Sequence, residues 1–392
     1  QKLDIKMIYF SKPTISKKEI SNINKVLQLG VLTNGYYQKK TESIIQKKIN
    51  SKFIALTQSC TDALELAATL INLKPGDEVI MPSYTFTSTA NAVVLRGAKP
   101  VFVDINSFDL NTNVNQIESL ISKKTKAIFI IHYGGNCMDL NKLLKIKKKH
   151  NLFLIEDTAH SFLSKYQNKY AGTIGDIGVF SFHETKNIVG GQGGAISINN
   201  QKLIGRANYL LDKGTDRTNF LRDHKKQFIS ENNNKIKKKY YSWVDVGSEY
   251  RASELASALI YSQFNRNKEI HQKRKKIWLT YFNFLFNLCN KNVELFTTDK
   301  KSLNVYHLFA FTAKNEKLAS KIRYYLQGKG IPATFHYVPL HSSIFGKKFR
   351  HGNMKTTNNI WKRVIRLPLY PELKQSEQAK ILKHLSIILN RV

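Results

Sequence analysis

One lysine, Lys186, stands in a loop framed by glycines directly after a short apolar run. The run Ile177-Gly178-Val179-Phe180 is typical of a buried strand, and Gly190-Gly191-Gln192-Gly193-Gly194 separates the loop from a second apolar run. A lysine at the end of a buried strand can lose hydration, which lowers the pKa of its amine and lets it form a Schiff base with a carbonyl. An ordinary surface lysine is the alternative, because the chain contains 62 lysine and arginine residues.

A second chemical group, Asp157, ends another apolar run. Leu152-Phe153-Leu154-Ile155 precedes Glu156-Asp157 and indicates a second buried strand. Ligands of an open parallel sheet bind beyond the carboxyl ends of its strands, so Asp157 and Lys186 should converge on one crevice. A lysine that holds an aldehyde and a carboxylate that keeps a pyridine nitrogen protonated suit pyridoxal 5′-phosphate (PLP). The pair therefore predicts a PLP site.

Several motifs together resemble the DegT/DnrJ/EryC1/StrS family of sugar aminotransferases, and the resemblance covers nearly the whole chain from Met7 onward. It implies the α/β fold of the type I PLP-dependent transferases, like aspartate aminotransferase, with a mainly parallel sheet and a smaller C-terminal α/β domain. It also implies a homodimer in which each active site borrows residues from the partner subunit. The motifs are Glu156-Asp157-Thr158-Ala159-His160, the loop Ser181 to Asn187 with its glycines, Ser59-Cys60-Thr61, and Gly76 to Phe86.

A phosphate site is expected at Ser59, Cys60 and Thr61, which precede an amphipathic helical run. Small polar residues at a helix start leave backbone NH groups free to bind a phosphate, and the helix dipole favours the negative charge. Ordinary helix capping by the same residues is the alternative. The resemblance supports the phosphate interpretation and adds Ser181 as a further phosphate contact.

The resemblance assigns three more residues to the cofactor. Phe86 occupies the position of an aromatic that stacks on the pyridine ring, and His160 that of a histidine or glutamine that bonds the ring oxygen. Arg251 stands where many members have an asparagine that reaches the phosphate of the neighbouring subunit, and a cation could also contact that phosphate. The segment Phe335 to His341 matches a small-domain motif that is expected near the sugar.

The reaction implied by the resemblance is a two-step transamination, in which Lys186 is the catalytic residue and L-glutamate is the amino donor. Gly76 to Phe86 and Phe182 to Asn187 look most like the members that act on dTDP-4-dehydro-6-deoxyglucose. The product would be the 4-amino sugar of galacto configuration that is used for enterobacterial common antigen.

Three other functions stay open at this point. A pyridoxamine-dependent sugar dehydratase is a close alternative, but relatives of that class replace the lysine by histidine, and this chain has Lys186. Transamination at C3 of a different nucleotide sugar is another alternative. A non-catalytic scaffold or regulator that retains the pocket is the third, and it would bind the cofactor without turning over glutamate.

The formal net charge of +34 would ordinarily suggest a nucleic-acid partner. The lysines are spread over the whole length among many Asn and Ile residues, however, and no reading helix, zinc knuckle or aromatic RNA-binding motif accompanies them. We therefore expect a solvated basic surface, which includes the run Lys273 to Lys276, and no nucleic-acid partner. Such a surface would still attract a nucleotide-sugar diphosphate.

No apolar run approaches the ~20 residues of a membrane span, and no signal peptide is recognised. Cys60, Cys137 and Cys289 have no metal-ligand spacing, which predicts free thiols and no metal site. Both observations favour a cytoplasmic protein.

The elements that position the site residues should alternate between strands and helices, as in a parallel sheet with right-handed crossovers. Ser16 and Glu19 have capping-box spacing and begin a first helix that should end at Gly30. Further strands are expected at 100–105 and 126–131. Residues 1–253 would form the large PLP-binding domain, with 1–6 as an extension, and 212–241 an exposed polar excursion.

Residues 254–392 would form a joining helix and the small domain. One long helix should run from Glu254 toward Trp278 and Phe282 and couple the two domains. The small domain should contain strands at 306–313 and 331–337 and helices at 315–326 and 376–389.

Overall fold

A seven-stranded sheet forms the centre of the protein in the computed structural model, which describes residues 7–218, 220–221, 240–289 and 291–391. The strand order is β1-β9-β8-β5-β4-β2-β3. Neighbours from β8 to β3 pair in parallel, whereas β9 is antiparallel to both β8 and β1. The prediction of a mainly parallel sheet is confirmed. The strands are β1 (Ile54–Thr57), β2 (Glu78–Pro82), β3 (Lys99–Val103), β4 (Thr125–Ile131), β5 (Phe153–Asp157), β8 (Ile177–Ser181) and β9 (Gly194–Ile198).

Hydrophobic clusters cover both faces of this sheet. Because successive side chains of a strand point to opposite faces, Ala127 and Phe129 of β4 join one cluster, and Ile128 and Ile130 join another. The first cluster packs against α3 (Cys60–Leu70), α4 (Thr87–Val94) and α7 (Gln201–Leu210), and the second against α5 (Ile117–Leu120) and α6 (Asn141–His150). Because helices cover both faces of the sheet, a ligand can reach it only at the ends of the strands.

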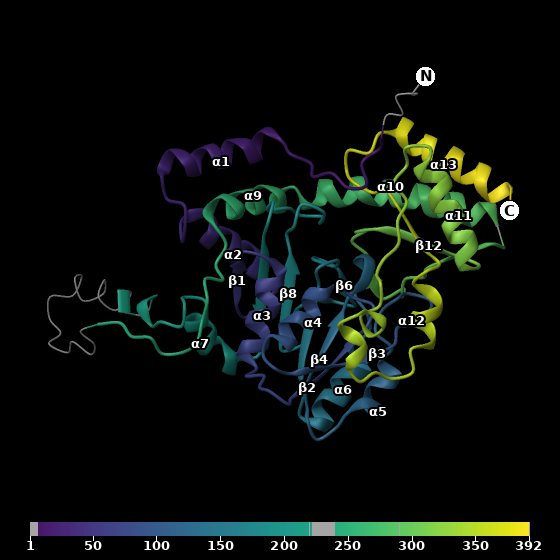
Figure 1. The fold of residues 1–392 in the computed structure, drawn as a ribbon. Helices are drawn as coiled ribbons and strands as arrows, with labels where there is room; N and C mark the ends of the chain where they lie inside the picture. The colour runs from purple at the N-terminus through teal and green to yellow at the C-terminus, as the bar shows by residue number, and fades with distance from the viewer. Residues whose placement is uncertain (1–6, 219, 222–239, 290, 392) are drawn as a thin grey trace.

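The small domain has its own core around the antiparallel sheet β10-β12-β13. Figure 1 shows it at one end of the molecule, in green and yellow. Ile8, from the N-terminal segment, also belongs to this core. The proposed division at 253/254 stays a prediction. The elements are β10 (Val293–Leu295), β12 (Phe309–Ala313), α11 (Glu316–Gln327), α12 (Lys355–Ile360), β13 (Val364–Leu367) and α13 (Gln375–Asn390).

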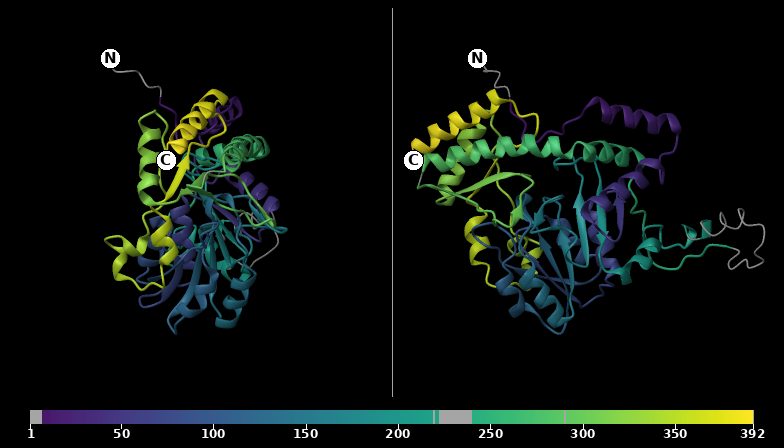
Figure 2. Two further views of the ribbon diagram at one scale, coloured as in Figure 1. Left: turned by 90° about the vertical axis from the view of Figure 1, so that its right-hand side faces the viewer. Right: turned by 180° about the vertical axis from the view of Figure 1, so that it is seen from behind.

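Two consecutive helices, α9 (Glu254–Asn265) and α10 (Asn267–Leu288), join the two parts of the protein (Figure 2). The prediction of one uninterrupted helix is wrong at Arg266, where ψ is 9°. The Arg266 guanidinium bonds Glu19 at 2.8 Å and Glu269 at 3.2 Å, which fixes the break against the first helix. The break lets α9 pack on α1 (Lys17–Leu29) and α2 (Tyr36–Ile49), while α10 packs on the small domain.

The predicted strand at 331–337 is also wrong. Only Thr334 makes an isolated bridge, to Arg366 of β13. Pro332 lacks the NH group that a strand ladder needs, and the segment after it bonds the large domain instead, through His336 to Tyr133 and Tyr337 to His160. This irregular segment carries two side chains into the site.

The first helix agrees with its prediction. It has the predicted capping box and ends at Gly30, which has a positive φ of 66°. Residues 1–6 and much of the predicted excursion lie outside the described residues. A short sheet is formed by β6 (Lys165–Tyr166), β7 (Lys169–Tyr170) and β11 (Ser302–Leu303). No helix in the described ranges has the length and apolar character to cross a membrane.

Candidate active site

A cavity of about 540 Å³ lies at the carboxyl ends of β5 and β8. One wall comes from the large domain and the other from α10, β13 and the irregular segments of the small domain. All the predicted site residues except Arg251 line it: Ser59, Cys60, Thr61, Phe86, Asp157, His160, Ser181 and Lys186.

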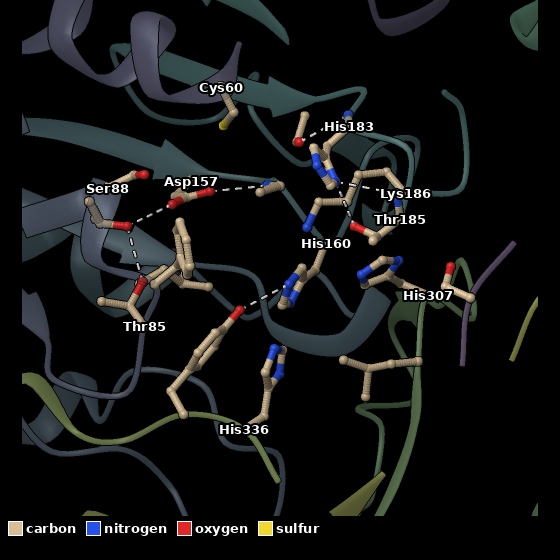
Figure 3. Close-up of a pocket in the computed structure, with 18 of the residues that line it drawn as sticks. Cys60, Thr85, Ser88, Asp157, His160, His183, Thr185, Lys186, His307 and His336 are labelled. Carbon is tan, nitrogen blue, oxygen red and sulfur yellow. Dashed lines mark hydrogen bonds between the residues drawn. The ribbon is translucent and has the colours of Figure 1, made fainter. Parts of the chain in front are cut away.

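Lys186 extends its side chain into this cavity, with Asp157 across from it and His160 close by (Figure 3). A compact turn fixes its backbone, because its NH donates to the carbonyl of His183 at 2.9 Å. Loss of hydration lowers the pKa of Lys186 to about 8; the charge of Asp157 opposes this shift and that of Arg366 reinforces it. About a tenth of the amine is therefore neutral at pH 7, far more than for an ordinary lysine, and the neutral amine is the form that acts as a nucleophile or base.

The Asp157 carboxylate is buried at the end of β5. Its Oδ2 accepts from the Thr89 hydroxyl at 2.9 Å, and its Oδ1 accepts from the backbone NH of Ala159 at 3.0 Å. Burial raises the pKa of Asp157, while these two bonds and Lys186 favour its charged form. The carboxylate is thus oriented and would be stabilised further by a cation in the cavity.

The N-terminus of α3 forms one end of the cavity. The Ser59 hydroxyl caps this helix by accepting from the NH of Asp62 at 3.0 Å, so ordinary capping is part of its role. The Thr61 hydroxyl lies 2.8 Å from that of Ser88. Burial raises the pKa of the Cys60 thiol, which keeps it neutral. Helix-start NH groups and hydroxyls gathered in this way suit an anion.

His160 lies at the junction of the two walls. Its Nε2 is 3.2 Å from the Tyr337 hydroxyl, and its ring stacks on His336 with 5.5 Å between centroids. Burial and the charge of Lys186 lower the pKa of His160 well below its ordinary value, so the ring is neutral. Its Nδ1 is buried and has no hydrogen-bond partner among the described residues.

Phe86 and Arg251 take different places. Phe86 occupies the N-cap position of α4 and lines the cavity, although 61% of its surface is exposed. Arg251 does not line this chain's cavity, because its Nη1 lies 3.6 Å from Oε1 of Glu42 and its backbone bridges to Thr57. Its expected contact with the phosphate of a neighbouring subunit stays a prediction.

The small-domain wall contributes residues that the sequence indicated only in part. His336 and Tyr337 of the predicted motif line the cavity, whereas His341 instead bonds Ser83 at 2.7 Å. His307, Arg274 and Arg366 were not predicted.

Arg274 is a correction, because it belongs to the run 273–276 that we expected to be solvated and yet is only 2% exposed. Arg366 could have been predicted from the sequence, because arginine is uncommon inside an apolar run such as Val364-Ile365-Arg366-Leu367 and its presence there indicates a specific role.

The arrangement fits PLP. Lys186 can hold an aldehyde, Asp157 can pair with a protonated pyridine nitrogen, and the free Nδ1 of His160 can bond a ring hydroxyl. The start of α3 with Ser181 can hold the phosphate. Within the described ranges, no group of three or more His, Cys, Asp or Glu residues is arranged to bind a metal ion.

Comparisons with known proteins agree with this geometry. Residues 13–386 match the model of the DegT/DnrJ/EryC1/StrS aminotransferase family. The uncharacterised protein MJ1066 of Methanocaldococcus jannaschii is 31% identical over 372 residues, which cover 93% of each chain. The spore coat polysaccharide biosynthesis protein SpsC of Bacillus subtilis is 28% identical over 94% of this chain and 93% of its own.

A solved aminotransferase structure has the same fold as this chain. PseC of Helicobacter pylori, an aminotransferase involved in the biosynthesis of pseudoaminic acid, is 25% identical and superposes with a TM-score of 0.88. The match covers 99% of this chain and 100% of PseC. The α/β fold expected from the sequence is therefore confirmed over the whole length.

Proposed function

The chain belongs to the DegT/DnrJ/EryC1/StrS aminotransferase family, and from this premise we propose that it moves an amino group from L-glutamate to C4 of dTDP-4-dehydro-6-deoxy-D-glucose. The family and the site make it a PLP-dependent sugar aminotransferase. The proposed product is dTDP-4-amino-4,6-dideoxy-D-galactose, for a surface polysaccharide such as enterobacterial common antigen. The observation that carries the proposal is the Lys186 amine, with its lowered pKa, in one cavity with the buried Asp157.

The choice of substrate has separate support. The similarity to SpsC and PseC favours a sugar intermediate of polysaccharide or surface-sugar synthesis. The choice of C4, of the dTDP sugar and of the galacto product rests on the stretches Gly76 to Phe86 and Phe182 to Asn187. Lys186 favours transamination over sugar dehydration.

The residues of this chain divide the chemistry among them. When bound, PLP would carry the amino group between the two half-reactions and withdraw electrons from the substrate carbon. Asp157 would keep the pyridine nitrogen positively charged, and the NH groups at the start of α3 would hold the phosphate. Lys186, whose pKa is about 8, would take the proton from the donor carbon and later return one to the sugar carbon.

We also propose a cytoplasmic homodimer. Arg251 lies outside this chain's own cavity, and Phe86 lines the cavity but is largely exposed. Residues that contact a second subunit would have such positions. The cysteines are all free, which supports a reducing compartment. Sedimentation of the purified protein tests the dimer directly.

A visible spectrum of the purified protein tests the function. We expect an absorption band from bound PLP that L-glutamate bleaches and that dTDP-4-dehydro-6-deoxyglucose restores. Restoration only by another keto sugar would contradict the proposed substrate and leave the family assignment intact. A band that L-glutamate and other amino donors do not change would contradict the enzymatic function and favour a PLP-binding scaffold.

A further inference from the structure

The first turn of α4 contacts both ends of the predicted PLP site through two neighbouring side chains. The Thr89 hydroxyl donates to Oδ2 of Asp157 at 2.9 Å, at the end expected for the pyridine nitrogen. The Ser88 hydroxyl lies 2.8 Å from that of Thr61, at the end expected for the phosphate. Figure 3 shows Ser88 and Asp157 on the same side of the cavity. One helical turn therefore joins the residues that would hold opposite ends of the cofactor.

A third hydroxyl, that of Thr85, supports Thr89. The two Oγ1 atoms are 3.0 Å apart. Thr89 has a single hydroxyl proton, which it gives to Asp157, so the Thr85 hydroxyl is the donor in the bond between the two threonines. Asp157, Thr89 and Thr85 are at most 5% exposed. The bonds thus form a buried chain that runs in one direction and ends on the carboxylate, and each bond strengthens the next.

Asp157 depends on its hydrogen bonds to stay charged. Burial raises its pKa, and the bonds from the Ala159 NH and the Thr89 hydroxyl oppose this more strongly than any neighbouring charge does. Of these two bonds, only the one from Thr89 comes from a side chain, so it is the one that a substitution can remove. The titratable groups that face Asp157 are Lys186, His132, Cys60 and Tyr337.

A second buried aspartate, Asp104, shows how a structural threonine bond differs. Its carboxylate accepts from the Thr357 hydroxyl and also from three backbone NH groups, those of Ile105, Thr356 and Thr357. A carboxylate has about four acceptor sites, so that of Asp104 is fully occupied. Asp157 accepts only two bonds from the described residues and lines the cavity. It therefore keeps acceptor sites for a ligand.

We propose that Thr89, supported by Thr85, is a positioning residue that keeps the Asp157 carboxylate charged and oriented for the cofactor, while Ser88 supports the phosphate end from the same turn. Thr89 acts on the cofactor only through Asp157. The inference rests on the proposed function in one respect, the binding of PLP, and does not depend on which sugar is used. Loss of the Thr89 and Ser88 hydroxyls should therefore affect opposite ends of one site.

The first test uses the PLP-free protein and does not depend on turnover. The pKa of Asp157 is measured by carbon NMR of protein labelled at the Asp carboxyl carbons, and Asp157→Asn identifies its signal. Thr89→Val keeps the shape of the side chain but removes the donor, so the pKa of Asp157 should rise by about 1. Thr89→Ser keeps the donor, and the pKa should stay within about 0.1 of that in the wild type.

The second test measures PLP binding and the two half-reactions by absorption. Thr89→Val should slow both half-reactions about 10-fold, which is the loss expected for one hydrogen bond to a charged group, and Thr89→Ser should restore them. Ser88→Ala leaves the Thr61 hydroxyl without this partner and should weaken PLP binding about threefold to tenfold. It should leave the pKa of Asp157 unchanged.

Thr85→Val is a further variant that decides the case if Thr89→Val does not fold. Removing the far end of the chain weakens the bond to Asp157 without breaking it. The pKa of Asp157 should then rise by about 0.3, and both half-reactions should slow about twofold.

The matched control is Thr357→Val, because the Thr357 hydroxyl also donates to a buried carboxylate but lies outside the cavity. This variant should lose stability and leave the pKa of Asp157, PLP binding and both half-reactions unchanged. A control that reproduces the effects of Thr89→Val would overturn the inference, because those effects would then come from a general loss of stability.

The inference is also overturned if the pKa of Asp157 does not rise in Thr89→Val or, should that variant not fold, in Thr85→Val. Two further results would contradict it: half-reactions that Thr89→Ser does not restore, and normal PLP binding by Ser88→Ala. If the wild type does not bind PLP, the proposed function fails, whereas the pKa of Asp157 in the PLP-free variants can still be compared. The two failures are thus distinct.

Discussion

The carboxylate in one wall of the cavity and the arginines in the other have different hydrogen-bond partners. In the large-domain wall, Asp157 is bonded to Thr89 and Ala159, and Ser59 is bonded to Asp62. In the small-domain wall, Arg274 is bonded only to carbonyls, and Arg366 has an unpartnered Nε among the described residues. The first wall is therefore ready for a cofactor that stays bound, while the second depends on a ligand that arrives and leaves.

We infer from this difference that the large-domain wall binds the cofactor and that the small-domain wall binds a substrate. Changes in the large-domain wall should affect both half-reactions, because both use the same cofactor. Changes in the small-domain wall should affect the half-reaction of one substrate. Residues that connect the walls should have smaller effects on both.

The largest effect is expected from Lys186→Ala. The variant loses the amine that binds the cofactor aldehyde and moves the protons, so turnover should fall by about 10⁴-fold or more. Transamination is measured with L-glutamate and the keto sugar, and the unfolding temperature serves as the folding control. Retention of turnover within about tenfold of the wild type, at unchanged stability, would contradict the role of Lys186.

Asp157→Asn should come next. The amide cannot stabilise a protonated pyridine nitrogen, so both half-reactions should slow by about 10²- to 10³-fold. Asp176→Asn is the matched control, because Asp176 is similarly buried but pairs with Lys147 at 2.7 Å outside the cavity. That control should lower stability and leave the rates of the PLP-loaded protein unchanged. Equal rate losses in both variants would mean that Asp157 acts only on the fold.

Lys186→Met should stabilise the PLP-free protein at neutral pH. The pKa of Lys186 is about 8 in the folded protein against an ordinary 10.5, so the unfolded chain binds more protons between these values. The free energy of unfolding of the wild type therefore rises as the pH rises from 8 to 10.5. Below pH 8 the buried Lys186 destabilises the fold by its full amount. At 1.36 kcal/mol per pKa unit, the variant should gain about 3 kcal/mol at pH 7.

Urea unfolding of the two PLP-free proteins measures this difference. The gain should shrink as the pH rises through 8 and should disappear above about 10.5. A gain that does not depend on pH would come from packing of the methionine and would argue against a lowered pKa of Lys186.

The sequence predicted the large-domain wall well because its residues follow buried strands. Asp157 and Lys186 each come after an apolar run, and the order of strands brings their ends together. The small-domain wall has no such regularity. His336 and Tyr337 were found as a motif but were placed on a strand that does not form, and Arg274 could not be distinguished from the lysines around it. Only the packing of α10 against His307 shows which of these basic residues is buried.

The smallest effect is expected at Asn187, which connects the two walls. Its Nδ2 donates to the carbonyl of Val305 at 2.7 Å, and its Oδ1 lies 3.0 Å from Nδ1 of His307. The carbonyl of His307 accepts from Arg274, so Asn187 links the Lys186 loop to the charged wall. Asn187→Ala should lose about 1–2 kcal/mol of stability and slow both half-reactions about 5- to 10-fold.

The matched control for this link is Asn199→Ala. The Asn199 amide donates to the carbonyls of Gly172 and Gly175, neither of which lines the cavity, whereas His307, a partner of Asn187, does. Its loss should lower stability by a similar amount and leave both half-reactions unchanged. If Asn187→Ala slows only one half-reaction, the residue belongs functionally to the small-domain wall, because the cofactor would still be held correctly. If it slows neither, the two walls are aligned by the packing of α9 and α10, and the hydrogen bonds of Asn187 contribute to stability alone.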